Sequence, residues 1–239
     1  MHDVEEVGAY YHKILPFYDA SLADRGDLLF WDSIVRRWGA KRILELGCGT
    51  GRVTEVLSRL GPVTAADLLI EMLGRARQAA PGANLVVADL RTFAFLSPFD
   101  LIVLANDPMA HLTSAEERMG VIRRIADHLT ANGRVVLEGL YRPRNRERSV
   151  GSALAVEESW EPADSTGVWN ATYRYKEGSK VTEARSVMRS WTIDELDHFR
   201  DAGLDIEHLW GDFREHPFSD ESERIVIVAC TRKVLSAEC

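Results

Sequence analysis

The chain has 239 residues, with 29 basic and 37 acidic side chains, a formal net charge of -8 and a hydrophobic content of 46%. This length and apolar content are enough for one sizeable core, so we expect a single domain with an elaboration. The acidic balance excludes a general electrostatic attraction to nucleic acid or to an anionic membrane, which favours a small-molecule partner.

The first residues, MHDVEEVGAYYHK, carry early acids and no apolar run of signal length, and no 18-residue apolar stretch occurs in the chain. We therefore expect a cytoplasmic protein with no membrane association. The three cysteines, Cys48, Cys230 and Cys239, are not at metal-ligand spacing with a histidine or with one another. Reduced thiols and no metal site are the expectation.

Residues 1–40 contain two helical stretches rich in aromatic side chains, and we expect them to form a helical cap. From residue 41 short β-branched runs alternate with amphipathic stretches, which is typical of βαβ units and a parallel sheet. The expected strands are 41–46, 62–67, 84–88, 99–105 and 133–140. The expected helices are about 52–60, 69–80 and 114–131, the last with a capping box of Ser114 and Glu117 and with Asn132-Gly133 between it and the next strand.

After residue 141 the pattern changes and predicts antiparallel strands at 152–160, 168–176 and 180–191, the last two joined as a hairpin at Glu177-Gly178-Ser179. Thr192 is the expected N-cap of a helix that ends at Gly203, and two closing strands are expected at about 204–210 and 224–231. The domain prediction is a cap over 1–40, a core over 41–141 and 192–239, and an antiparallel insertion over 142–191 that covers the active site.

The stretch ILELGCGTGR (43–52) is a strand that ends in a glycine loop and leads at once into a helix. Such a loop lets the backbone approach a nucleotide-like ligand closely. The dinucleotide fingerprint is G-x-G-x-x-G, whereas this loop reads G-x-G-x-G and follows Glu45, an acid that would repel a pyrophosphate. S-adenosylmethionine, which carries a sulfonium and an amino group, fits this loop better.

These residues resemble the class I S-adenosylmethionine-dependent methyltransferases, and the resemblance covers residues 41–233. It implies a Rossmann-like α/β fold with a seven-stranded, mostly parallel sheet whose last strand is reversed, for which ERIVIVACTRK is the candidate. Asp67 in VTAADLLIEML stands where the family has a ribose-binding acid, and Asp89 in NLVVADLRTF stands where an acid faces the adenine amine. The residues expected to contact the donor are Glu45, Gly47, Cys48, Gly49, Gly51, Arg52, Asp67, Leu68, Met72, Asp89, Leu90, Ala105 and Asn106.

A narrower resemblance is to small-molecule N- or O-methyltransferases, including sugar-nucleotide N,N-dimethyltransferases, which have antiparallel strands after the fifth strand and an aromatic cap. The segment ANDPMAHL (105–112) resembles the family's segment that ends in His-Leu, and FYDA (17–20) resembles the Tyr-Asp of the cap. Where the family often has small residues before that histidine, this chain has Asp107-Pro108-Met109, which leaves the details of the acceptor pocket open.

Methyl transfer from a sulfonium is an in-line displacement that requires alignment and the exclusion of water, and an amine or hydroxyl acceptor must also lose a proton. His111 is the candidate base, with a packing or capping role as the alternative. Tyr11 and Tyr18 are candidates to close over the donor or acceptor, with a core role as the alternative. The candidate acceptor contacts are Asp107, Met109, Tyr141, Arg142 and Arg144.

The arginine-rich stretch YRPRNRERSV (141–150) suits a carboxylate or phosphate group of the acceptor, and a solvated charge run is the alternative. The prediction is a methyltransferase acting on N or O of a small metabolite, with secondary metabolism as the expected context. A non-catalytic module that binds S-adenosylmethionine and a nicotinamide-dependent oxidoreductase are the competing classes. Nucleic-acid methylation is disfavoured, a homodimer is left open, and the sequence does not identify the acceptor.

Overall fold

The computed structural model describes residues 4–23 and 25–232, so Cys239 lies outside the described residues. The helices are α1 (Val4–Leu22), α2 (Leu28–Trp38), α3 (Arg52–Ser58), α4 (Ile70–Ala79), α5 (Ala115–Asp127) and α6 (Asp197–Asp201), with short 3₁₀ turns η1 (Pro108–His111) and η2 (Ile193–Leu196). The strands are β1 (Ile43–Leu46), β2 (Val63–Asp67), β3 (Asn84–Val87), β4 (Phe99–Leu104), β5 (Leu129–Leu140), β6 (Arg146–Val150), β7 (Leu154–Pro162), β8 (Val168–Glu177), β9 (Lys180–Arg189), β10 (Leu204–Trp210) and β11 (Arg224–Thr231).

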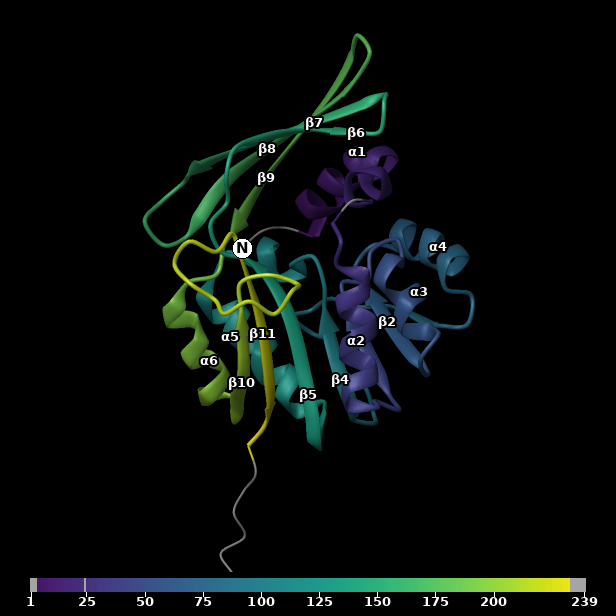
Figure 1. Cartoon of the computed structure of the whole chain (residues 1–239), viewed down its shortest axis with the longest axis vertical. Helices are drawn as coiled ribbons and strands as arrows, with labels where there is room; N and C mark the ends of the chain where they lie inside the picture. The colour runs from purple at the N-terminus through teal and green to yellow at the C-terminus, as the bar shows by residue number, and fades with distance from the viewer. Residues whose placement is uncertain (1–3, 24, 233–239) are drawn as a thin grey trace, which may run out of the picture.

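The larger sheet has seven strands in the order β10-β11-β5-β4-β1-β2-β3. Strands β1 to β5 pair in parallel, while β11 runs antiparallel to both β5 and β10. Helices α2, α3 and α4 pack on one face and α5 and α6 on the other, each face with its own buried apolar cluster (Figure 1). The predicted Rossmann-like fold, with a reversed last strand in a mostly parallel sheet, is confirmed.

The second sheet, called here the extension sheet, consists of β6, β7, β8 and β9, all paired antiparallel. It lies above the carboxyl ends of the parallel strands, and α1 lies between it and the core (Figure 1). A third apolar cluster joins α1 to this sheet, including Phe17 stacked on Tyr175 with ring centroids 4.8 Å apart. The two helices of the predicted cap therefore lie in different layers, because Trp31 and Ile34 bury α2 against the core instead.

Several local expectations are confirmed. A two-residue turn joins β8 to β9 after Glu177, the Glu195 carboxylate accepts a 3.0 Å hydrogen bond from the backbone N–H of Thr192, and Gly203 follows the last helix at φ 79°. The prediction of a capping box at Ser114 is wrong, because no side-chain cap hydrogen bond forms there.

The expected break at Asn132-Gly133 is also wrong, since β5 already begins at Leu129. The register between β4 and β5 shifts there, and a Cβ on Gly133 would lie 2.9 Å from the Thr130 nitrogen. The glycine thus accommodates an irregular strand start rather than ending a helix.

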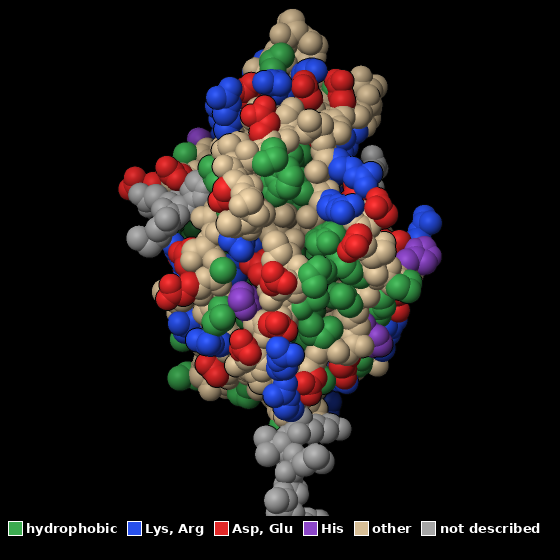
Figure 2. Space-filling view, turned by 90° about the vertical axis from the view of Figure 1, so that its left-hand side faces the viewer, with side chains coloured by type: hydrophobic (Ala, Val, Ile, Leu, Met, Phe, Trp, Pro, Cys, Tyr) green, Lys and Arg blue, Asp and Glu red, His purple; other side chains and the backbone are tan. Residues whose placement is uncertain are grey.

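Three further features of the molecule are its surface charge, the character of its helices and its thiols. Acidic and basic side chains are interspersed on the face shown in Figure 2, with hydrophobic side chains between them. Among the described residues, none of the helices combines the length and the apolar character that a membrane crossing requires. Cys48 and Cys230 are both free thiols.

Candidate active site

The glycine loop after β1 is held against the end of β2 by its own backbone. The N–H groups of Gly47 and Cys48 both donate to the carbonyl of Ala66, at 2.8 and 3.0 Å. The next N–H, that of Gly49, donates to the Asp67 carboxylate at 2.8 Å. Asp67 therefore fixes the loop as well as ending the second strand.

All three glycines of this loop have left-handed backbones and close neighbours. Gly47 has φ 72°, and a Cβ there would clash with the side chain of Pro108. Gly49 has φ 56°, and a Cβ there would lie 3.2 Å from the Tyr18 hydroxyl. Gly51 has φ 87°, and a Cβ there would lie 2.8 Å from the Cα of Ala76, so it is needed for the packing of α3 on α4. The bare backbone at Gly49 leaves room beneath α1 for a ligand.

A first cavity lies over this loop, at the carboxyl ends of β1, β2, β3 and β4, where open parallel sheets bind ligands. Asp67 and Asp89 both face it from neighbouring strand ends. The lining residues are Val4, Val7, Tyr11, Tyr18, Gly47, Gly49, Asp67, Leu68, Leu69, Met72, Ala88, Asp89, Leu90, Arg91, Ala105, Asn106, Pro108, His111 and Leu112.

The two acids of the first cavity sit in different electrostatic surroundings. Burial raises the pKa of Asp67, and this rise is only partly offset by the hydrogen bonds it accepts from backbone N–H groups, including that of Leu69 at 2.9 Å. Burial would also raise the pKa of Asp89, but hydrogen bonds from Arg91 lower it below the usual value. The ion pair of Asp89 and Arg91 therefore faces the first cavity, just after β3.

A second cavity of about 460 Å³ lies between the core, α1 and the extension sheet. It shares with the first cavity the side chains of Tyr11, Tyr18, Asn106 and His111. Burial raises the pKa of Tyr18 to about 12 and that of Tyr11 well above its usual value, so both are neutral phenols near neutral pH. The two cavities therefore meet at four polar side chains.

His111, the candidate base, is buried with only 8% of its surface exposed. Its Nε2 lies 3.1 Å from the Tyr11 hydroxyl, and its Nδ1 lies 3.3 Å from the Ser186 hydroxyl of β9. Tyr18, in contrast, accepts a 3.4 Å hydrogen bond from the Asn106 amide. The structure brings the three predicted catalytic side chains together at the junction of the cavities.

The backbone at the end of β4 is unusual, since Asn106 and Asp107 have φ 59° and 47° without being glycine. The Asn106 N–H donates to Glu138 at 2.7 Å, and the Asp107 carboxylate accepts a 2.7 Å hydrogen bond from the Leu140 N–H. Burial raises the pKa of Asp107 to about 7 despite the nearby charge of Arg118. Non-glycine residues in this region cluster at functional sites.

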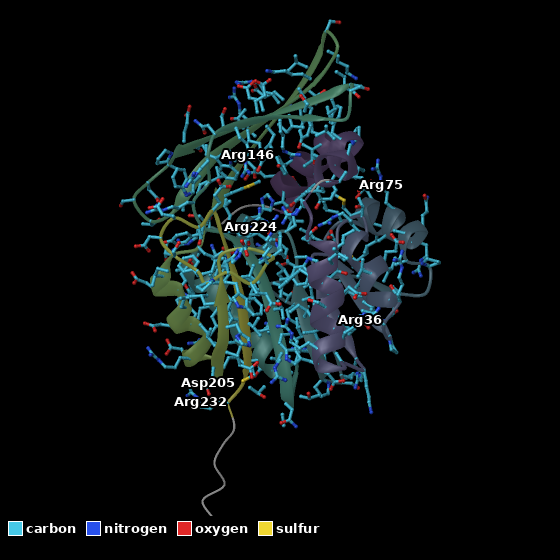
Figure 3. All side chains as sticks on the ribbon, viewed as in Figure 1. Arg36, Arg75, Arg146, Asp205, Arg224 and Arg232 are labelled. Carbon is cyan, nitrogen blue, oxygen red and sulfur yellow. The ribbon has the colours of Figure 1, made fainter. Side chains whose placement is uncertain are left out.

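One wall of the second cavity carries a buried ion cluster that connects three distant segments. Glu138 accepts hydrogen bonds from Arg25, which precedes α2, and from Arg224 at 2.9 Å, and Arg25 also donates to Asn106 at 2.8 Å. The opposite wall carries Arg146 and Arg148, each 3.3 Å from Glu158. Figure 3 shows Arg146 and Arg224 on the two sides of the space between the sheets.

Four residues predicted to contact the donor lie outside the linings of both cavities. Glu45 accepts a 2.6 Å hydrogen bond from Thr54 inside the core, and burial raises its pKa to about 8. Cys48 packs in the apolar core, and Gly51 packs against α4. Arg52 pairs with Asp27 through hydrogen bonds of 2.6 and 2.7 Å. These residues support the loop from behind, and a direct contact with the donor stays a prediction for them.

Of the predicted acceptor contacts, only Asp107 lines the second cavity. Met109 is fully buried in the core, and Tyr141 packs on Phe218 with ring centroids 4.7 Å apart. Arg142 and Arg144 are about half exposed, at 48% and 52%, and face acids of the segment before β11. The strand β6, which the sequence did not indicate, turns the later arginines of the run toward the cavity instead.

The sequence reasoning missed Arg25, Arg224 and Ser186, which approach the site from segments with no local motif. Arg146 and Arg148 belong to the arginine run of residues 141–150. Their spacing of two residues, which puts both on one face of a strand, is the feature of the sequence that could have identified them. The described residues contain no group of three His, Cys, Asp or Glu side chains placed to hold a metal ion.

Comparison with known proteins gives a match to the family described as "Methyltransferase domain" over residues 43–133, the segment from β1 to the start of β5. This segment holds the glycine loop, Asp67 and Asp89. The chain therefore carries the methyltransferase domain of an S-adenosylmethionine-dependent enzyme. The residues around the first cavity fit its donor, since carboxylates end the second and third strands and Gly49 leaves the space that a side chain would fill.

Two similar curated proteins come from Streptomyces. The methyltransferase is 24% identical to a cypemycin N-terminal methyltransferase of a Streptomyces species, over 94% of this chain and 98% of that protein. It is 29% identical to a dTDP-3-amino-3,6-dideoxy-alpha-D-glucopyranose N,N-dimethyltransferase of Streptomyces fradiae, over 61% of this chain and 56% of that protein. The chain thus spans nearly all of the first relative and just over half of the second.

Solved structures share the fold of the methyltransferase. A S-adenosylmethionine-dependent methyltransferase from Clostridium acetobutylicum superposes with a TM-score of 0.78 at 17% identity, covering 93% of this chain and 99% of that one. An amino pentose methyltransferase from Micromonospora echinaspora, solved with S-adenosylmethionine bound, gives a TM-score of 0.73 at 22% identity over 89% and 95% of the two chains.

Proposed function

We propose that this methyltransferase transfers the methyl group of S-adenosylmethionine to an amine nitrogen of a small acceptor held in the second cavity. The observation that carries this proposal is the meeting of the two cavities at Tyr11, Tyr18, Asn106 and His111. A donor in the first cavity and an acceptor in the second would face each other across these side chains.

On the donor side, Asp67 would hold the ribose hydroxyls and Asp89 the adenine amine, with Met72 and Leu90 against the rings. When bound, the donor supplies an electrophilic methyl group on a positively charged sulfur. The residues of α1 cover this site, because Tyr18 approaches Gly49 and the Asp19 carboxylate accepts a 2.5 Å hydrogen bond from Thr50 of the loop. This cover would exclude water from the displacement.

On the acceptor side, the chain has to orient a nitrogen lone pair and receive a proton. The neutral phenols of Tyr11 and Tyr18 provide a polar but uncharged surface for the nitrogen, and His111 is the group that would take the proton. The net reaction adds a methyl group to nitrogen and releases one proton.

The arginines of the second cavity would give an anionic group of the acceptor guanidinium partners. Four arginines line this cavity beside four acids, and Glu138 and Glu158 each face two of the arginines. Guanidinium groups bind carboxylate and phosphate oxygens in a defined geometry. The two Streptomyces relatives are named as a cypemycin N-terminal methyltransferase and an amino sugar nucleotide N,N-dimethyltransferase, which supports a nitrogen acceptor and a role in secondary metabolism.

The test is to incubate the chain with donor labelled with ¹³C in the methyl group and a panel of acceptors. The panel holds an aminodeoxysugar nucleotide, a peptide with a free N-terminus, and analogues of each in which a hydroxyl replaces the amine. We expect labelled product from an amine and none from its hydroxyl analogue, identified by mass spectrometry and NMR. Labelling of hydroxyl acceptors alone would overturn N-methylation, and donor binding without turnover on any metabolite extract would favour a non-catalytic module.

The role of His111 is tested separately with His111→Ala. We expect unchanged donor affinity and a kcat lower by about 10²–10⁴-fold if proton removal limits the rate. A matched control is His128→Ala, because His128 is also partly buried but its ring nitrogens bond to the Phe95 N–H and the Arg124 carbonyl, outside both cavities. A wild-type kcat in His111→Ala would mean that alignment alone carries the reaction.

A further inference from the structure

Ser186 of β9 contacts the ring of His111 from the side opposite Tyr11. Its hydroxyl oxygen lies 3.3 Å from Nδ1 of the ring and 3.4 Å from the carbonyl oxygen of Val187. Nε2 of the same ring lies 3.1 Å from the Tyr11 hydroxyl. Each nitrogen of His111 therefore has a hydroxyl partner, one from β9 and one from α1.

The Val187 carbonyl can only accept a hydrogen bond, and a serine hydroxyl has one proton to donate. When Ser186 donates that proton to Val187, its oxygen is left to accept from Nδ1–H. The neutral ring then carries its proton on Nδ1, and Nε2 presents a lone pair to the Tyr11 hydroxyl. The hydrogen bond at Nδ1 therefore decides whether Nε2 carries a proton or a lone pair.

The position of Ser186 separates it from the reacting groups. It lines a third cavity, on the outer side of α1 and the extension sheet, and it lines neither of the two cavities where His111 stands. The side chain of Ser186 therefore contacts the site through its hydrogen bond with His111.

We propose that Ser186 is a positioning residue that fixes the tautomer of His111, so that Nε2 is the atom that receives the acceptor's proton. This inference rests on the proposed function, in which His111 is the base. As the nitrogen of the acceptor gains its methyl group, its proton passes to Nε2 by way of the Tyr11 hydroxyl, which gives its own proton to Nε2 and takes that of the acceptor, and the ring becomes an imidazolium. The Nδ1–H of that imidazolium keeps its hydrogen bond to the Ser186 oxygen. The positive charge therefore forms on a ring that already donates to an oxygen.

The kinetic test uses two variants of nearly equal shape, Ser186→Thr and Ser186→Val, of which only threonine keeps a hydroxyl. We expect Ser186→Val to lower kcat by about 3- to 10-fold, the effect of losing one hydrogen bond, with unchanged KM for the acceptor. Ser186→Thr should keep kcat within about twofold of the wild type. A wild-type kcat in Ser186→Val, or an equal loss in both variants, would overturn the proposal.

A second measurement needs no turnover. The protein is labelled with ¹⁵N-histidine, and the His111 ring is assigned by the signals that disappear in His111→Gln. We expect the Nδ1–H form in the wild type and in Ser186→Thr, and a shift toward the Nε2–H form in Ser186→Val. The same tautomer in all three proteins would refute the role of Ser186. A wild-type protein that methylates no amine would instead refute the proposed function while this result still stands.

Discussion

Replacement of Asp67 by alanine is the perturbation that most directly probes the donor site. Its carboxylate accepts hydrogen bonds from the N–H groups of Gly49 and Leu69, at 2.8 and 2.9 Å, and it lines the first cavity. Loss of the charge-assisted hydrogen bonds to the ribose is expected to lower donor affinity by about 1.5–3 kcal/mol, which is roughly 10- to 150-fold in Kd. Calorimetric titration with S-adenosylhomocysteine measures this change.

Asp100→Ala is the matched control for this experiment. The Asp100 carboxylate also accepts from two backbone N–H groups, those of Lys41 and Arg42, at 3.1 and 3.0 Å, but it lies outside both cavities. We expect it to lower stability while leaving the donor Kd unchanged. A wild-type Kd in Asp67→Ala, or an equal loss of affinity in both variants, would refute a direct contact between Asp67 and the donor.

Three further predictions concern charges elsewhere in the chain. Joint replacement of Arg146 and Arg148 by alanine should raise the acceptor KM and weaken its salt dependence, as kinetics at low and high salt would show, because partly exposed ion pairs are screened. The Glu45→Gln variant should become more stable relative to the wild type as the pH rises from about 5 to about 8, as urea unfolding would measure. Burial raises the pKa of the Glu45 carboxyl, so the folded wild type binds more protons than its unfolded state and loses stability over this range. Arg52→Met should lower the free energy of unfolding by about 3 kcal/mol, because it removes the main partner of the buried Asp27. Arg59→Met, at the residue that follows α3, should change it by less than about 0.5 kcal/mol.

Each of these has a result that would contradict it. Equal salt dependence of the acceptor KM in the wild type and the double arginine variant would return Arg146 and Arg148 to a purely structural role. Parallel stability curves for Glu45→Gln and the wild type across the pH range would mean that this carboxyl titrates normally in the folded chain. Equal effects of Arg52→Met and Arg59→Met would mean that the buried pair contributes no more than the exposed one.

The sequence was sufficient for those parts of the site that are encoded locally. The glycine loop, Asp67 and Asp89 each stand at the end of their own strand, and parallel strands bring such ends to one edge of the sheet. The face of β1 on which Glu45 lies could not be predicted, because a strand residue points to one of two faces and all four residues of β1 are buried. Its neighbour Thr54, on α3, is what the carboxylate contacts.

The remaining parts depend on contacts between distant segments. Arg25 reaches Asn106 across 81 residues, and Ser186 reaches His111 across 75, so no spacing in the sequence links either pair. The arginine run was recognised, but which of its members face the cavity depends on where β6 begins. Arg146 and Arg148 lie on that strand, while the two arginines before it stay in an exposed loop.

The most direct test of the donor and acceptor assignment is a crystal structure of the chain with S-adenosylhomocysteine bound. We expect the adenosyl group between Asp67 and Asp89, and the sulfur facing the junction formed by Tyr11, Tyr18 and His111, with the second cavity open beyond it. A ligand bound outside the first cavity, or one whose sulfur points away from that junction, would contradict methyl transfer between the two cavities.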